Sequence, residues 1–458
     1  MGVAVSDWRL ARAVSQRGQL GVVSGTGLDT VFIRRLQDGD VGGHLRRAMA
    51  AFPIPAVAER VLKKYFRAEG RPTGTPYLML PMYRRVASTS RETLTALAAF
   101  VEVWLAREGH DNPVGINLLT KVQRPNMATL YGAMLADVGY VLMGAGIPRE
   151  IPAVLDALSQ HQLATLRLDA IGVPSSAPIH ITLDPAQFWD AVPAPLMRPK
   201  FLPIVASNSL ATLLAHKGRG GIDGFIIEGP TAGGHNAPPR GAPTFNERGE
   251  PVYGARDVVD LGEIAALGLP FWVAGGTGNP DALRSARAAG ATGIQVGTLF
   301  AYSDQSGLDA KLRHSVLVSA ARGEVSVLTD PHASPTGYPF KVVDWPGNPA
   351  ATVPRERICD LGYLRVAFQE EGGRINYRCA AEPVDAYLAK GGSLEETVGR
   401  RCLCNALMAN VGIPQHRDNG TIEPPLITSG DDLPSIGSFL NGRTSYSASD
   451  VIDYLLDR

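Results

Sequence analysis

The sequence is poor in several features that mark whole classes of proteins. It has four cysteines in 458 residues, and the first of them is Cys359. Lys and Arg together number 44, as do Asp and Glu, so the formal net charge is zero. A balanced chain without a long basic block gives no electrostatic basis for binding nucleic acid or an anionic membrane. We therefore expect neither a nucleic-acid partner nor a membrane partner.

Long apolar runs are also missing. No uninterrupted hydrophobic stretch is long enough to span a bilayer, and the chain does not open with the basic and apolar segments of a secretory signal. The expectation from these absences is a cytoplasmic protein. No Gly-x-Gly-x-x-Gly motif follows a predicted strand, so no Rossmann dinucleotide-binding domain is predicted.

Glycine and proline are abundant instead, with 50 and 34 residues. Both residues suit the many short loops that join strands to helices in barrels. The length and the hydrophobic content of 45% allow a large buried core. They predict one big domain with an appendage, or two to three domains.

Three short apolar runs each end in a loop with little side-chain bulk. The runs cover residues 225–227, 269–274 and 293–296, and their loops contain Gly233 and Gly234, Gly275 and Gly276, and Gly297 and Thr298. Such runs are typical of buried parallel strands. Bare loops let a phosphate approach the backbone N–H groups. The order strand, Gly-Gly, helix, strand, Gly-Thr is what the phosphate site at the last two strands of a TIM (β/α)₈ barrel requires.

These motifs carry a resemblance to a known family. The chain resembles the FMN-dependent nitronate monooxygenases, once called 2-nitropropane dioxygenases, and through them the FMN-dependent enoyl-acyl-carrier-protein reductases. The resemblance rests on residues 228–235, 274–276 and 295–300, with residues 115–118 and 144–148 upstream. It implies a TIM barrel that binds FMN as its cofactor. It also implies the oxidation of alkyl nitronates by O₂ without NAD(P)H.

The resemblance gives roles to individual residues. His235 matches the family's histidine, and its titration range suits a general base or a charge partner for an anionic substrate. The alternative is a surface histidine on a plain strand-to-helix turn. Glu228, Gly233 and Gly234 lie in the same loop as His235. The cofactor phosphate would lie on Gly275, Gly276, Gly297 and Thr298.

The remaining predicted cofactor contacts come from earlier loops. The Asn117 amide would suit the N–C=O edge of the flavin ring. Lys121 would favour the reduced anionic flavin, unless it is a solvated loop lysine. Ser207 would donate a hydrogen bond to the flavin side chain or phosphate, and Gly144, Ala145 and Gly146 would lie near the ring.

Met1, Gly2 and Val3 resemble the loop that follows the first barrel strand and lies against the flavin. The strand before them is missing, and an open barrel edge leaves backbone groups unpaired. We therefore expect a mis-called or truncated start, or another segment that fills the gap.

Two other functions stay open from the sequence. One is an NAD(P)H-dependent enoyl-thioester reductase on the same scaffold, with acyl-carrier protein and NAD(P)H as partners. The other is a non-catalytic protein that binds flavin or a metal. Nitronate oxidation, by contrast, needs only a small-molecule substrate and O₂. A homo-oligomer is possible for each of the three functions.

The predicted domains are an FMN-binding barrel over residues 1–330 and a C-terminal extension over residues 331–458. Within the barrel we expect a helical insertion at about 40–110 and an irregular one at about 165–200. The helical insertion would cap the mouth of the site, or serve as extra scaffold or an oligomer contact.

The extension contains Cys359, Cys379, Cys402 and Cys404. Four thiolates can bind Zn²⁺ or an iron–sulfur cluster, which predicts a metal site there. Buried free thiols are the alternative.

Overall fold

The computed structural model describes residues 2–217, 221–349 and 355–457. Met1, which the sequence assigned to the flavin loop, lies outside the described residues. None of the helices in these ranges combines the length and the hydrophobicity needed to cross a bilayer.

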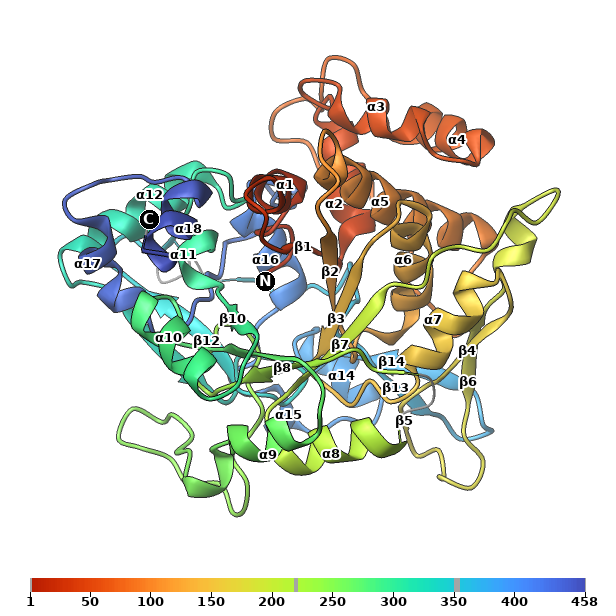
Figure 1. Cartoon of the computed structure of the whole chain (residues 1–458). Helices are drawn as coiled ribbons and strands as arrows, with labels where there is room; N and C mark the ends of the chain where they lie inside the picture. Colours follow the sequence, from red (N-terminus) through yellow and green to blue (C-terminus); the bar gives the residue numbers. More distant parts are fainter. Residues whose placement is uncertain (1, 218–220, 350–354, 458) are drawn as a thin grey trace.

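A curled parallel sheet forms the centre of the molecule (Figure 1). Its strands are β1 (Gly21–Ser24), β2 (Val114–Leu119), β3 (Tyr140–Gly144), β7 (Lys200–Val205), β8 (Phe225–Glu228), β9 (Phe271–Ala274) and β10 (Gly293–Gln295). Neighbours in the sheet follow the chain order, and each pair is parallel. Strands β8, β9 and β10 carry the three apolar runs found in the sequence, because strands covered on both faces have no need of polar alternation.

The predicted α/β barrel fold is confirmed, but as an open half-barrel. Within the described residues the central sheet has seven strands, and β1 and β10 form its edges without pairing to each other. The sequence-based expectation of a closed ring of eight strands is therefore wrong for the described residues, which form an open sheet of seven strands.

The edge of β1 is covered by the N-terminal segment. Ser6 Oγ donates to the carbonyl of Val22 at 2.6 Å, and the N–H of Ser24 donates to the Ser6 carbonyl at 2.8 Å. The N–H of Gly21 donates to Ser15 Oγ at 3.1 Å. Backbone groups that would otherwise be orphaned at an open edge therefore have partners.

Helix α1 (Trp8–Gln16) precedes β1, and α11 (Thr298–Ala301) and α12 (Ala310–Ala321) follow β10. The helices that lie between consecutive strands of the sheet are α2 (Leu28–Gln37), α6 (Gln123–Leu135), α7 (Ile151–Ser159), α8 (Asn208–Lys217), α9 (Leu261–Ala266) and α10 (Pro280–Ala288). Such crossovers are the connection that parallel neighbouring strands require.

The long connection between β1 and β2 contains three further helices, α3 (His44–Ala50), α4 (Pro55–Tyr65) and α5 (Thr89–Arg107). In Figure 1, α3 and α4 lie at the top, on the outer side of α5. Phe52 and Phe100 join them through an edge-to-face contact with 5.1 Å between ring centroids. The irregular stretch near residues 165–200 holds β4 (Ala164–Arg167), β5 (Ala170–Ile171), β6 (His180–Leu183) and a 3₁₀ turn, η1 (Pro185–Phe188).

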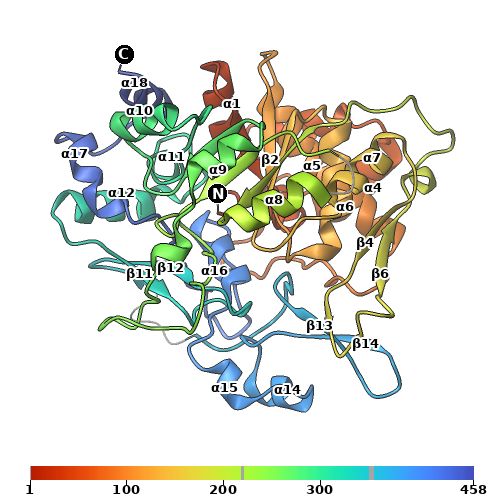
Figure 2. The same ribbon diagram turned by 60° about the horizontal axis from the view of Figure 1, so that its bottom comes forward.

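The C-terminal part packs on the barrel. It contains β11 (Ser326–Asp330), β12 (Phe340–Asp344), β13 (Val366–Gln369), β14 (Ile375–Arg378), α14 (Val384–Ala389), α15 (Leu394–Thr397), α16 (Leu403–Asn410), η3 (Leu433–Ser435), α17 (Ile436–Leu440) and α18 (Ala448–Leu455). The predicted boundary after residue 330 falls between β11 and β12, which pair with each other. Figure 2 shows α14, α15 and the β13–β14 hairpin at one end, while α16 reaches the centre.

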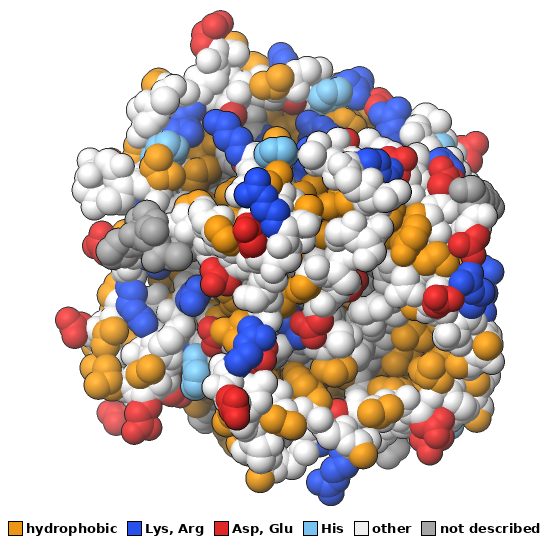
Figure 3. Space-filling model, turned by 90° about the vertical axis from the view of Figure 1, so that its left-hand side faces the viewer, with side chains coloured by type: hydrophobic (Ala, Val, Ile, Leu, Met, Phe, Trp, Pro, Cys, Tyr) orange, Lys and Arg blue, Asp and Glu red, His pale blue; other side chains and the backbone are white. Residues whose placement is uncertain are grey.

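The surface agrees with the balanced composition. Figure 3 shows basic, acidic and apolar side chains interspersed over one face of the molecule, with no broad area of a single charge among the described residues of that face. This face therefore offers no extended basic surface of the kind that nucleic acid requires.

Candidate active site

A cavity of about 470 Å³ lies inside the curled sheet. Small-molecule sites usually fall between about 300 and 1,000 Å³. The predicted site residues that line it are Gly2, Val3, Asn117, Gly144, Ala145, Glu228, Gly233, Gly234, His235, Gly275, Gly276, Gly297 and Thr298. They come from separate strand ends, so the structure brings together residues that are far apart in sequence.

Three predicted residues lie outside the lining of this cavity. Ser207 Oγ accepts a hydrogen bond from the N–H of Leu210 at 3.1 Å and thereby caps the start of α8. Gly146 packs against Thr120, since a Cβ built on it would lie 3.0 Å from the Thr120 Cβ. The third residue is Lys121. The cofactor roles of these residues stay predictions.

Lys121 is not a solvated loop lysine. Its Nζ donates to the carbonyl of Thr336 at 3.3 Å and lies 3.5 Å from the centroid of the Tyr338 ring. Burial lowers the pKa of Lys121 to about 8. The ammonium is therefore held against the C-terminal part of the chain, next to the loop that carries His235.

The glycine loops form a cradle of bare backbone. Gly275 and Gly276 have φ values of +95° and +66°, in the left-handed region that favours glycine. A Cβ on Gly275 would lie 3.1 Å from the Ala232 nitrogen, whereas a Cβ on Gly297 would meet nothing within 4 Å. The loops are thus packed against each other but leave open space at Gly297, which suits an anion bound by backbone N–H groups.

Residues 427–432 of the C-terminal part form another wall of the cavity, which the sequence did not predict. The N–H of Gly234 donates to Thr428 Oγ1 at 2.9 Å, and the N–H of Asp431 donates to the carbonyl of Thr231 at 3.0 Å. Thr298 Oγ1 donates to the carboxylate of Asp432. A signal was present, because Leu426 and Ile427 precede Thr-Ser-Gly-Asp-Asp and so repeat the apolar-run-then-glycine pattern.

Other C-terminal residues also line the cavity, among them Phe340, Tyr363, Cys404 and Met408. Within the described chain, the insertion at residues 40–110 contributes none of the lining residues. The helical insertion was expected to cap the site, but the C-terminal part lines it instead.

His235 lies at the cavity wall and is held by the C-terminal part. Its Nε2 is 2.7 Å from Ser334 Oγ, which lies 2.8 Å from Thr336 Oγ1. Its ring contacts the edge of Phe340, with 4.8 Å between the centroids. Burial, and secondarily the nearby charge of Lys121, lower the pKa of His235 to about 4. The imidazole is therefore neutral at pH 7 and able to accept a proton.

Glu228 has the opposite perturbation at the end of β8. Burial raises the pKa of this carboxyl to about 7. Near neutral pH the site thus contains an imidazole without a proton on its basic nitrogen and a carboxyl that is partly protonated. Environments that push two pKa values apart in this way are typical of sites that move protons.

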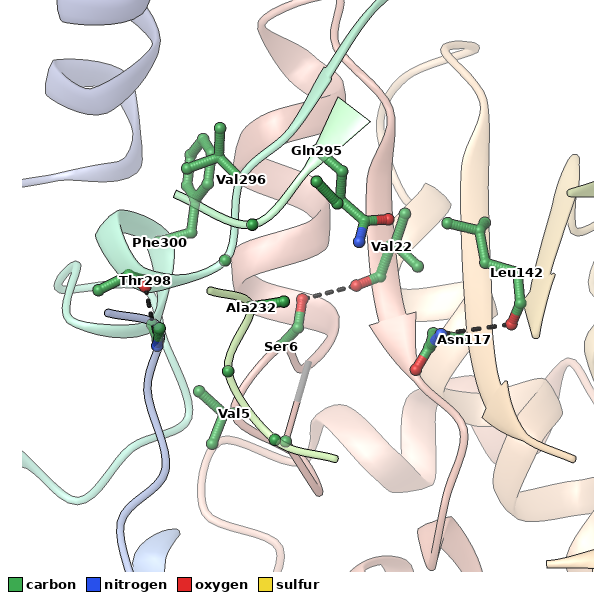
Figure 4. Close-up of a pocket in the computed structure, with 18 of the residues that line it drawn as sticks. Val5, Ser6, Val22, Asn117, Leu142, Ala232, Gln295, Val296, Thr298 and Phe300 are labelled. Carbon is green, nitrogen blue, oxygen red and sulfur yellow. Dashed lines mark hydrogen bonds between the residues drawn. The ribbon is translucent and has the colours of Figure 1, made fainter. Parts of the chain in front are cut away.

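Figure 4 shows the side of the cavity between the two edge strands. The Asn117 amide donates to the Leu142 carbonyl at 3.3 Å, so this donor is engaged with the sheet. Gln295 extends from β10 towards Val22 of β1, and its Oε1 is buried without a hydrogen-bond partner among the described residues. This polar atom faces a space that the described chain leaves open.

The four cysteines are free thiols, and the described residues give no support for a metal site at them. All four line one small cavity in the C-terminal part. However, the described residues contain no group of three or more His, Cys, Asp or Glu side chains that could hold a metal ion. Cys402 Sγ accepts a hydrogen bond from the Asn405 amide at 3.7 Å. The expectation of Zn²⁺ or an iron–sulfur cluster at Cys359, Cys379, Cys402 and Cys404 is therefore not supported.

Comparisons with solved structures return proteins of low sequence identity. FabK from Thermotoga maritima is 15% identical, with 99% of this chain and 88% of that chain covered and a TM-score of 0.48. Nitroalkane oxidase from Streptomyces ansochromogenes is 14% identical, with 100% and 93% covered and a TM-score of 0.48. The enoyl reductase domain of MlnA from the macrolactin biosynthesis cluster of Bacillus amyloliquefaciens is 11% identical, with 100% and 92% covered and a TM-score of 0.47. Likeness at this level says nothing about the substrate.

No curated protein matches the chain significantly. One family model matches residues 198–329, and its description is nitronate monooxygenase. This range contains β7 to β10, the glycine loops and His235. The match supports an oxidoreductase of this general kind. The resemblance expected from the sequence is confirmed, because residues 198–329 match the nitronate monooxygenase family model.

Proposed function

We propose that the protein is an FMN-dependent oxidoreductase whose cofactor occupies the cavity inside the sheet. The observation that carries this proposal is the meeting of three glycine-ended strand loops at one cavity beside His235. His235 is the sole histidine among the described residues that line it. The open space at Gly297 and the left-handed backbone of Gly275 and Gly276 fit a phosphate group held by N–H donors.

Bound FMN supplies the redox chemistry that no side chain of the cavity can supply. The chain itself contributes the cradle, the enclosure and the proton acceptor. His235 lines the cavity and is unprotonated near neutral pH, so its basic nitrogen is free to accept a proton from a neutral substrate. Lys121, beside the same loop, adds positive charge that would stabilise a negative charge developing on substrate or cofactor.

The finer reaction that these residues favour is oxidation of alkyl nitronates by O₂. A neutral imidazole can take the α-proton of a nitroalkane or hold the nitronate that results. The His235 imidazole is unprotonated at pH 7, so it can accept a proton but holds no additional one to supply. The match of residues 198–329 to the nitronate monooxygenase model agrees with this reaction.

A second candidate, enoyl-thioester reduction with NAD(P)H, is favoured by the length of the cavity. Its lining continues from the glycine cradle to Leu10 and Val14 of α1 and to Ile452 and Leu455 of α18. These side chains are apolar and would suit an acyl chain, including one carried by an acyl-carrier protein, better than a small nitroalkane.

The deciding experiment begins with the absorption spectrum of the purified protein, which should show a bound flavin. Mixing with NADH or NADPH without oxygen then separates the two reactions. Nitronate oxidation predicts bleaching by an alkyl nitronate and none by the nicotinamides, whereas enoyl reduction predicts rapid bleaching by one of them. A protein that binds no FMN would refute both and favour the non-catalytic alternative.

The role of His235 has its own test. His235→Asn should lower turnover about 10²–10⁴-fold and retain FMN, as expected for loss of a general base. His216→Asn is the matched control, because His216 is exposed on α8 and does not line the cavity. Full activity of His235→Asn on the oxidised substrate would exclude His235 as the base.

A further inference from the structure

Two residues that line the cavity have buried hydroxyl groups without a well-formed hydrogen bond among the described residues. Tyr302 is 1% exposed and Ser429 is 5% exposed, and neither Tyr302 Oη nor Ser429 Oγ makes a hydrogen bond of standard geometry among the described residues. The two hydroxyls lie close enough to interact with each other. Buried polar atoms are almost always hydrogen-bonded in folded proteins. Both residues line the same cavity, so they mark a place where a ligand can supply the missing acceptor.

The position of these hydroxyls is next to the glycine cradle. Tyr302 follows α11, which begins at Thr298, directly after Gly297. Ser429 packs on the loop of Gly233, because a Cβ on that glycine would lie 2.7 Å from the Ser429 carbonyl carbon. Both hydroxyls are thus at the end of the cavity that holds the open space at Gly297, where the proposed function puts the cofactor phosphate.

The segment that carries Ser429 is fixed in place from both sides. Lys341 Nζ forms an ion pair with Asp431 at 2.6 Å, and Thr428 accepts the N–H of Gly234 at 2.9 Å. A ligand atom at Ser429 would therefore meet a group that is already held in position. Such preorganisation lowers the conformational cost of binding.

The hydroxyl of Thr298, which the sequence assigned to the phosphate, is already engaged. It donates to the Asp432 carboxylate and accepts the N–H of Gly430 at 3.3 Å. Arg287 is the sole Lys or Arg that lines the cavity within the described residues. It lies in the last turn of α10, before β10 begins, and so at the opposite end of the strand from the cradle. A phosphate at the cradle must therefore be held by neutral donors.

We propose that Tyr302 and Ser429 donate hydrogen bonds to the phosphate of the flavin cofactor, so that residues 428–432 are part of the cofactor site. This rests on the proposed function, in which the cavity binds FMN. A hydroxyl rotates freely enough to aim its proton at an acceptor, and a hydrogen bond to a charged phosphate oxygen is stronger than one to a neutral group. Tyr302, inside the family-model match, and Ser429, outside it, then together select a phosphorylated flavin over an unphosphorylated one.

The test compares FMN with riboflavin, which has the same ring and side chain but no phosphate. Flavin-free, full-length Ser429→Ala and Tyr302→Phe variants are titrated with each flavin by fluorescence. We expect each variant to bind FMN about tenfold or more weakly than wild type, as loss of a hydrogen bond to a charged group implies, and riboflavin with unchanged affinity. Ser438→Ala on α17 and Tyr454→Phe on α18 are matched controls, because neither residue lines the cavity.

The outcomes separate this inference from the function on which it rests. Equal loss of FMN and riboflavin affinity, or no loss of either, overturns the phosphate role while leaving the flavin site intact. A wild-type protein that binds neither flavin refutes the proposed function instead. Thermal unfolding of the flavin-free variants supplies a further check, because two hydroxyls without partners add little stability to the empty protein. A marked loss of stability in the flavin-free variants would overturn the inference in favour of a structural role.

Discussion

Gly233 and Gly234 are adjacent, yet they resist a side chain for different physical reasons. A Cβ on Gly233 would lie 2.7 Å from the Ser429 carbonyl carbon and 2.8 Å from the Gly430 nitrogen, both of them backbone atoms. A Cβ on Gly234 would meet nothing within 4 Å, but this residue has a φ of +85°. We therefore predict that Gly233→Ala pushes residues 428–432 away from the barrel, whereas Gly234→Ala strains only its own backbone.

The two variants should lose similar stability. Overpacking a close contact costs about 1–3 kcal/mol. Left-handed backbone costs an alanine about 1–2 kcal/mol. Unfolding in urea therefore should not distinguish them, but flavin binding should, because only Gly233→Ala displaces Ser429 and Gly430 from the cavity wall.

The assay is a titration of each purified, flavin-free variant with FMN, combined with its urea unfolding curve. We expect Gly233→Ala to bind FMN at least tenfold more weakly than Gly234→Ala at comparable stability, since it disturbs contacts that the other variant keeps. If Gly233→Ala binds FMN as tightly as wild type, or if Gly234→Ala loses as much affinity, residues 428–432 are not a functional wall of the site.

Three further changes have outcomes that follow from the structure. The pKa of His235 is about 4 in the folded protein and about 6.5 in the unfolded chain, so the unfolded chain binds the proton first as pH falls. The free energy of unfolding should therefore fall by about 3 kcal/mol between pH 6.5 and pH 4. His235→Asn should remove this part of the loss, as measured by urea unfolding across that range. The raised pKa of Glu228 has the opposite effect on stability, because the free energy of unfolding falls as pH rises from 4.5 through 7. Glu228→Gln should therefore raise the free energy of unfolding at pH 8 by about 3 kcal/mol, and no gain there would contradict the burial of this carboxyl. Ser15→Ala should cost about 1–3 kcal/mol, since it leaves the N–H of Gly21 at the sheet edge unpaired, whereas Ser438→Ala on the surface should cost nothing measurable.

The strands and their glycine loops could be predicted because their signals are local. Apolar runs such as residues 225–227 and 293–296 indicate where a buried strand lies, and glycine indicates where the chain turns sharply. A parallel sheet then brings the carboxyl ends of its strands to one edge. The convergence of Gly276, Gly297 and His235 therefore follows from the sequence and the topology together.

Contacts between distant segments could not be predicted in this way. Ser429 lies almost 200 positions after Gly233, and nothing local to either residue indicates that they touch. Cysteines close in sequence suggested a metal site, but closeness in sequence does not ensure the ligand geometry that a metal needs, and no such group is found among the described residues. Ser207 illustrates a third difficulty, because a hydroxyl after a strand suits a ligand and a helix cap equally well, and here it caps α8.

The cavity takes its lining from almost the whole length of the chain, from Gly2 to Leu456. During synthesis, the strands and glycine loops leave the ribosome long before residues 428–432 and α18 do. A nascent chain therefore has an open, water-filled cradle, and the enclosed pocket arises only when the final helix docks. Loading of a prosthetic group would then follow translation, and a protease that trimmed the last few turns would release it while sparing the sheet.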